Sequence, residues 1–190
     1  MPRVSDTHKA ARRTLILDAA RTCFARKGYQ LTTIRELETE SGLSSGAIFN
    51  YYPTKLDIFI ALAEEDSARG AQRWRVGGLR AVVDDYAQTG LRYTASYLEV
   101  GRQLLTDPDF RQRWEQRGQV VVEAVRDRLQ TLRDVGSVRT DVPLDHLVTY
   151  SLITLDGTLL QLRLSTPLEQ VHGAVDLYEQ TLRPPQEATH

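Results

Sequence analysis

The chain has 190 residues, 41 % hydrophobic and 26 % charged, which is the balance of an ordinary globular protein. No apolar run approaches the roughly 20 residues that a membrane-spanning helix needs, so no membrane partner is expected. The first residues lack the apolar stretch of a secretory signal. A single cysteine, Cys23, excludes an internal disulfide and agrees with a reducing, cytoplasmic location.

The formal net charge is -1, but the charge is unevenly distributed along the chain. Residues 1–55 contain nine Lys or Arg and five Asp or Glu, whereas the remaining residues contain fifteen and twenty. A basic segment joined to an acidic body is typical of a protein that brings one small domain to phosphate.

The first predicted helix covers about residues 12–27 and ends at Gly28. A basic arm, residues 1–11, precedes it. The side chains that give the helix its apolar face are Leu15, Ile16, Ala19, Ala20, Cys23 and Phe24.

Two short helices joined by a sharp turn are predicted next. Thr33 is expected to cap the first of them, and Glu36 completes a capping box. Gly42 suits the left-handed backbone that ends this helix. Ser44 is expected to cap the second helix and Pro53 to stop it. This layout is typical of a helix-turn-helix that reads DNA.

The second helix, residues 45–51, is small at its front and aromatic at its back. Small residues let the backbone approach base edges, and the tips of Asn50 and Tyr51 can reach bases or phosphate. Lys55 is expected to bind phosphate at the start of the following helix. The complete set of predicted DNA-binding residues is Thr33, Ser44, Ser45, Gly46, Phe49, Asn50, Tyr51 and Lys55.

The rest of the chain also has helical periodicity. Thr54 caps a helix that is expected to run to about residue 74, and Gly77 and Gly78 break the pattern. Further helices are predicted at about residues 79–88, 91–105, 108–134, 141–164 and 167–183, which makes about nine in all.

The predicted helix at residues 141–164 is apolar on nearly every face, so it must be covered on both sides. A two-fold partner chain could cover the second side in a four-helix interface. A central helix enclosed within one monomer is the alternative. The expected interface residues are Leu152, Leu155 and Leu159.

Patterns for catalysis are missing. The four histidines lack a Cys or carboxylate at metal-ligand spacing, and neither a glycine-rich phosphate loop nor a nucleophile elbow occurs. We therefore expect no enzyme and no required cofactor. A sensor pocket is more plausible, among the polar side chains of the later helices: Tyr93, Tyr97, Glu99, Gln103, Arg128, Tyr150 and Asp156.

Several N-terminal segments, at their joint spacing, resemble the DNA-binding domain of TetR-family transcriptional regulators. The segments are Gly28-Tyr29, Thr32-Thr33-Ile34-Arg35, Ser41-Gly42-Leu43-Ser44, Gly46-Ala47-Ile48-Phe49 and Tyr51-Tyr52-Pro53-Thr54-Lys55. The family usually carries Ala where this chain has Glu38 and Ser41. The carboxylate of Glu38 must therefore point outward or find a partner.

Later segments resemble the aconitase-repressor branch of the same family. They are Leu104-Leu105-Thr106-Asp107-Pro108-Asp109-Phe110, Trp114, Ala124-Val125-Arg126-Asp127-Arg128-Leu129, Arg139-Thr140-Asp141-Val142-Pro143, Leu155-Asp156-Gly157 and Asp176-Leu177-Tyr178-Glu179. Regulators of that branch respond to citrate with a divalent cation, and Arg128 and Glu179 occupy the positions of its ligand-site arginine and acid. A guanidinium can fork onto a carboxylate, and an acid can face the cation.

The resemblance thus implies an effector site at Arg128 and Glu179, with Mg²⁺ bound together with a carboxylate effector and facing Glu179. Glu99, one of the polar side chains named above, is the third predicted effector-binding residue. Ion pairs on a helix surface are the alternative for these residues. The predicted fold is all-α: a three-helix helix-turn-helix DNA-binding domain at residues 12–55, a helical ligand-binding and dimerisation domain at residues 56–183, and a polar tail at 184–190.

The predicted function is that of a homodimeric one-component transcriptional regulator, a repressor that binds palindromic double-stranded operator DNA and is modulated by a small-molecule effector. The alternative is a helical small-molecule-binding or protein-interaction module with a vestigial DNA-binding head. Salt-dependent binding to duplex DNA distinguishes the two.

Overall fold

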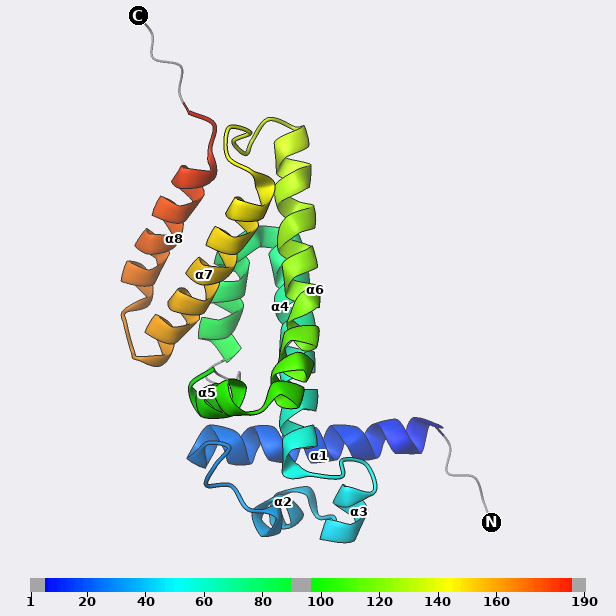
Figure 1. The fold of residues 1–190 in the computed structure, drawn as a ribbon. Coiled ribbons are helices and arrows are strands. Elements are labelled where there is room, and N and C mark those ends of the chain that lie inside the picture. Colours follow the sequence, from blue (N-terminus) through cyan, green and yellow to red (C-terminus); the bar gives the residue numbers. More distant parts are fainter. Residues whose placement is uncertain (1–5, 90–96, 186–190) are drawn as a thin grey trace, which may run out of the picture. The chain divides into compact units, whose positions relative to one another are not determined.

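The computed structural model describes residues 6–89 and 97–185, and within these residues all the regular secondary structure is helical (Figure 1). This confirms the all-α fold. The helices are α1 Asp6–Lys27, α2 Ile34–Ser41, α3 Ser45–Phe49, α4 Lys55–Thr89, α5 Tyr97–Thr106, α6 Pro108–Asp134, α7 Leu144–Arg163 and α8 Leu168–Leu182.

Helix α4 contains the break that the paired glycines predicted, but no loop separates its two parts. Gly78 has φ 67° and ψ -154°, so the helix stops there and resumes at once in a new direction. The expected two helices are therefore one kinked element. This is why the described residues form eight helices where about nine were expected.

Helix α1 begins at Asp6, six residues before the predicted start. The first turns carry no apolar stripe, so periodicity gave no sign of them. Ala10 and Ala11 are nevertheless the strongest of helix formers, and neither Gly nor Pro interrupts the segment. Much of the predicted basic arm is thus helical, with Lys9 and Arg13 exposed on it.

The chain forms two compact units. The first comprises Met1–Asp66 and Leu91–Arg117, and the second comprises Ser67–Gly90 and Gly118–His190. Helices α4 and α6 contribute to both units, so the units do not follow one another along the sequence. The functional boundaries expected at residues 12, 56 and 184 remain predictions.

The core of the first unit joins α1, α2 and α3 to the first part of α4. Ile16, Leu37 and Ile48 are fully buried, one from each of the first three helices. An aromatic chain extends this core to α6: the ring centroids of Tyr29 and Phe59 lie 4.7 Å apart, and Phe59 stacks on Trp114 at 5.9 Å. These contacts hold the two short helices rigidly from behind.

A buried ion pair also ties α1 to α4. Arg21 donates to Asp66 at 2.7 Å and to Glu65 at 2.8 Å. Desolvation alone would lower the pKa of this guanidinium, but the two carboxylates raise it above its usual value. Since breaking a buried pair leaves a charge uncompensated, this contact fixes α1 in place.

The core of the second unit is built from the last part of α4 and from α6, α7 and α8. Its largest buried side chain is Trp74, packed with apolar residues of all three later helices. One polar pair, Ser151 and Tyr178, lies inside this core. Ser151 Oγ uses its single hydrogen to donate to the carbonyl of Leu147 at 2.7 Å. The Tyr178 hydroxyl, 2.6 Å from Ser151 Oγ, must therefore donate to that oxygen. Burial raises the pKa of Tyr178 to about 12, which keeps that donor protonated.

Candidate nucleic-acid interface and ligand cavity

Helix α2 begins with the predicted capping box. The backbone N–H of Thr33 donates to Glu36 Oε2 at 2.9 Å, and the N–H of Glu36 donates to Thr33 Oγ1 at 3.4 Å. Lys27 of α1 forms an ion pair with the same carboxylate. The hydrogen bonds from Lys27 and Thr33 lower the pKa of Glu36 to about 2, so it is ionised at neutral pH.

The turn and the start of α3 also agree with the sequence. Gly42 has φ 67°, the left-handed conformation predicted for it. Ser44 caps α3 by accepting from the N–H of Ala47 at 3.3 Å. Helix α3 ends at Phe49 rather than at the predicted Tyr51, and Asn50 is its C-terminal cap. The first three helices thus form a helix-turn-helix in which α2 and α3 lie side by side (Figure 1).

Most of the predicted DNA-binding residues are exposed on this motif. Ile48 is fully buried, so the opposite side of α3 faces outward. Thr33, Ser44, Gly46, Phe49 and Asn50 are exposed, whereas Ser45, Tyr51 and Lys55 are half-buried. Exposed Phe49 is the type of apolar side chain that contacts a thymine methyl group, and the exposed Asn50 amide can pair with adenine.

Lys55 has a second role that the sequence did not indicate. Its ammonium donates to the carbonyls of Tyr29 and Thr32, each at 2.8 Å, and to that of Gln30 at 3.3 Å. It also lies 4.5 Å from the centre of the Tyr29 ring. Lys55 therefore holds the segment between α1 and α2. A DNA phosphate that binds Lys55 would have to compete with these carbonyls for the N–H groups of the ammonium.

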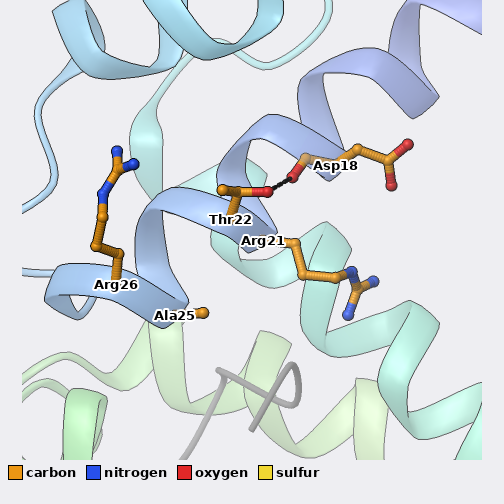
Figure 2. Close-up of a pocket in the computed structure, with 5 residues that line it drawn as sticks. All are labelled: Asp18, Arg21, Thr22, Ala25 and Arg26. Atoms are coloured by element: carbon orange, nitrogen blue, oxygen red, sulfur yellow. Dashed lines mark hydrogen bonds between the residues drawn. The ribbon is translucent and has the colours of Figure 1, made fainter. Parts of the chain in front are cut away.

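A polar hollow of about 550 Å³ runs beside α1, lined by Asp18, Arg21, Thr22, Ala25 and Arg26. Figure 2 shows the guanidinium groups of Arg21 and Arg26 pointing away from each other, and the hydroxyl of Thr22 donating to the carbonyl of Asp18. Because Arg21 is engaged by Asp66 and Glu65, the described residues of the lining do not offer converging polar groups for a ligand.

The second unit contains a cavity of about 220 Å³ that brings two predicted effector residues together. Arg128 of α6 and Glu179 of α8 both line it, with Trp74, Gly78 and Tyr178 among their neighbours. They are 51 positions apart, and both are half-buried. The cavity has a second cationic group, exposed Arg183, in its lining beside several apolar side chains. Two arginines and one acid over an apolar floor are suited to a small anion. The side chain of Glu99, the third predicted residue, lies outside the described part of the structure.

Arg128 is also bound to the kink in α4. Its Nη1 donates to the carbonyls of Arg75 at 3.0 Å and Val76 at 3.2 Å, which belong to the last turn before the break. A Cβ on Gly78 would lie 3.2 Å from Arg128 Nε. The same guanidinium therefore lines the cavity and caps the broken helix.

Glu179 is the one residue for which the sequence predicted a metal contact. Among the described residues, no cluster of three or more His, Cys, Asp or Glu side chains could hold a metal ion. A divalent cation that entered with a polycarboxylate would bring most of its oxygen ligands with it and would keep several waters, so one protein carboxylate fits it.

The predicted interface leucines do not share one environment. Leu155 is 8 % exposed and belongs to the core of the second unit, and Leu152 and Leu159 are half-buried against that core. The exposed apolar side chains lie elsewhere on α7 and α8, with Ile153 66 % and Leu177 65 % exposed. Because the sequence showed only that α7 is apolar all round, it could not separate its two faces.

A helix-turn-helix with an exposed reading helix, joined to a second helical unit with its own cavity, is the architecture of a transcription regulator. Within the described ranges, 6–89 and 97–185, no helix has the length and apolar character to cross a membrane.

Comparisons with known proteins define the regulator further. Residues 16–62 match the family described as bacterial regulatory proteins, tetR family. The HTH-type transcriptional repressor AcnR of Corynebacterium diphtheriae is 40% identical over 185 residues, covering 96% of this chain and 97% of the relative. The HTH-type transcriptional repressor Rv1474c of Mycobacterium tuberculosis is also 40% identical over 185 residues, with 96% and 99% covered.

A solved structure shows the same fold. Regulatory protein TetR from Rhodobacter sphaeroides superposes with a TM-score of 0.73 at 17% identity, covering 90% of this chain and 98% of that one. The chain belongs to the TetR family of transcriptional regulators, in the branch of the AcnR repressors. As a member of this family of regulators it is not an enzyme, which confirms the expectation from its missing catalytic patterns.

Proposed function

We propose that the chain is a homodimeric repressor that binds a two-fold symmetric operator and releases it when a carboxylate effector binds with a divalent cation. The observation that carries the DNA-binding part is the geometry of α3. Its inner side chain, Ile48, is locked in the core, while Gly46, Phe49 and Asn50 are exposed together. A short helix held this rigidly can present the same side chains to each half-site.

Dimerisation is supported by the apolar surface of α7 and α8. Ile153 and Leu160 are exposed on α7, Leu164 continues their helical spacing at the C-terminal cap of that helix, and Leu177 is exposed on α8. Glycines at 157 and 173 lie in the same two helices, with open space where a Cβ would be, so a partner backbone could approach closely. Two such helices from each chain would bury these side chains in a four-helix interface.

The effector part of the proposal rests on the cavity of the second unit. Arg128 would bind a carboxylate of the effector, and Glu179 would face the cation. Citrate with Mg²⁺ is the first candidate, because this chain has an arginine and an acid at the two ligand positions of the branch.

The signal could pass through the kink in α4. Arg128 now donates to two carbonyls of the last turn before Gly78. An effector that draws this guanidinium toward its own carboxylates would weaken that cap and change the equilibrium between bent forms of α4. Helix α4 begins at Lys55, directly after the helix-turn-helix. A change in the bend of α4 would therefore change the distance between the two helix-turn-helix motifs of a dimer.

Duplex binding tests the function. We expect the wild-type chain to enrich a two-fold symmetric sequence from a pool of random duplexes, with an affinity that falls steeply as salt rises. Failure to enrich any sequence would instead favour a ligand-binding module with a vestigial head.

Titration calorimetry then tests the effector. Citrate with Mg²⁺ should bind the wild type and the variant Arg126→Ala, but not Arg128→Ala. Arg126 is the matched control because it lies two residues away on α6 and pairs at the surface with Asp145. No heat and no thermal stabilisation of the wild type at millimolar citrate would exclude this effector.

A further inference from the structure

Glu38 departs from the alanine usual in this family, and its carboxylate has a defined partner. Its Oε1 accepts a hydrogen bond from the backbone N–H of Ser45 at 2.5 Å. Glu38 lies in the last turn of α2, and Ser45 is the first residue of α3. The side chain therefore bridges the two helices of the reading motif.

The second departure from alanine, Ser41, acts on the same turn. Its Oγ donates to the carbonyl of Leu37 at 2.6 Å and accepts from the N–H of Leu43 at 3.3 Å. Both polar side chains thus satisfy backbone groups of the connection between α2 and α3. In this chain, side-chain hydrogen bonds reinforce a turn that alanine could only pack against.

Helix α3 depends on such contacts because it has only five residues. A helix this short is not stable by itself, so its direction depends on the packing of Ile48 in the core and on the contacts at its ends. Ser44 caps the N–H of Ala47, and Glu38 takes the N–H of Ser45. A carboxylate at this end also interacts favourably with the positive end of the helix dipole.

The position of Glu38 has an electrostatic consequence for DNA binding. The side chain is half-buried and bonds to Ser45, which we place at the groove. A negative charge there repels the phosphates of any duplex, whatever its sequence. Glu38 therefore has two separable effects: its hydrogen bond orients α3, and its charge lowers affinity for all DNA.

We propose that Glu38 is a positioning residue for operator recognition, which holds α3 at its reading angle and raises discrimination between operator and random DNA rather than overall affinity. This rests on the proposed DNA-binding function.

Three variants separate the hydrogen bond from the charge. Glu38→Gln keeps an oxygen acceptor and removes the charge, whereas Glu38→Ala removes both. Glu40→Gln is the control, because Glu40 lies on the same helix and pairs with Arg26 at the surface at 3.8 Å. Fluorescence anisotropy at one salt concentration gives the dissociation constants for a duplex selected from a random pool by the wild type and for a scrambled duplex of equal length.

We expect Glu38→Ala to lower the ratio of the two affinities about tenfold, the effect of one hydrogen bond to a charged group. Glu38→Gln should keep the wild-type ratio while binding both duplexes more tightly, and Glu40→Gln should keep the ratio as well. A wild-type ratio in Glu38→Ala, or an equal loss in Glu38→Gln, would overturn the proposal. Selection that enriches no duplex would instead refute the DNA-binding function itself.

A measurement without DNA covers the case of a poorly folded variant. Amide hydrogen exchange at Ser45 should be slow in the wild type and in Glu38→Gln, and fast in Glu38→Ala, while amides in the core of the unit stay protected. Equal protection of the Ser45 amide in all three proteins would show that Glu38 does not hold α3.

Discussion

Replacement of Lys55 by Met should destabilise the first unit. Methionine keeps most of the apolar stem but removes the ammonium that donates to the carbonyls of Tyr29, Gln30 and Thr32. A hydrogen bond from a charged donor contributes about 1.5–3 kcal/mol. Because the site is half-buried and water can replace part of the lost contacts, we expect a total loss of about 2–3 kcal/mol in the free energy of unfolding.

The two tryptophans allow the free energy of unfolding to be followed separately in each unit. Trp114 lies in the core of the first unit and Trp74 in that of the second. In a Trp74→Phe background, urea unfolding followed by fluorescence reports the first unit alone. The control is Lys9→Met, which removes an equal charge from an exposed site on α1 and should change stability by less than about 0.5 kcal/mol.

DNA binding by the same variant tests the predicted phosphate contact. If Lys55 also binds phosphate, Lys55→Met weakens specific and random duplexes alike and reduces the salt slope by about one. Loss of binding to one sequence only would contradict that role. An unfolding midpoint equal to that of Lys9→Met would refute the argument that Lys55 holds the segment between α1 and α2.

Three further predictions follow from the described contacts. The pKa of Glu36 falls from 4.5 to about 2 on folding, so its stabilising contribution is present above about pH 4.5 and is lost as the pH drops toward 2. Glu36→Gln should therefore reduce the fall of the urea unfolding midpoint between pH 4.5 and pH 2, and an unchanged pH profile would contradict this. Ile153→Asp should sediment as a monomer, because a dimer interface would bury the unpaired carboxylate. Val135→Asp, at an equally exposed apolar site outside α7 and α8, should remain a dimer. A dimeric Ile153→Asp variant would show that Ile153 does not belong to the interface. Gly78→Ala should lower the thermal midpoint of the second unit, because φ 67° with ψ -154° is a conformation that essentially only glycine adopts, which costs a side chain about 1–3 kcal/mol, and because the new Cβ meets Arg128. Gly118→Ala, where the space for a Cβ is open, should not lower it, and equal midpoints would refute the strain.

Local signals were sufficient to predict the reading motif from the sequence. The capping box at Thr33 and the cap at Ser44 each involve residues three positions apart, and the left-handed turn needs only the glycine at 42. Such interactions form within one turn of chain, so their residue pattern carries the information. The start of α1 at Asp6 was missed because its first turns have good helix formers but no apolar stripe to reveal them.

The partners of the charged side chains were decided only by the tertiary structure. Lys55 reaches carbonyls 23 to 26 positions earlier, and Arg128 reaches carbonyls more than 50 positions earlier. Helix α7 shows the same limit for apolar residues, since the sequence pattern pointed to Leu155 as an interface residue, whereas Leu155 is buried in the core of its own unit and Ile153 is exposed. Hydrophobic periodicity indicates that a residue is to be covered, but which element covers it depends on long-range packing that no local pattern encodes.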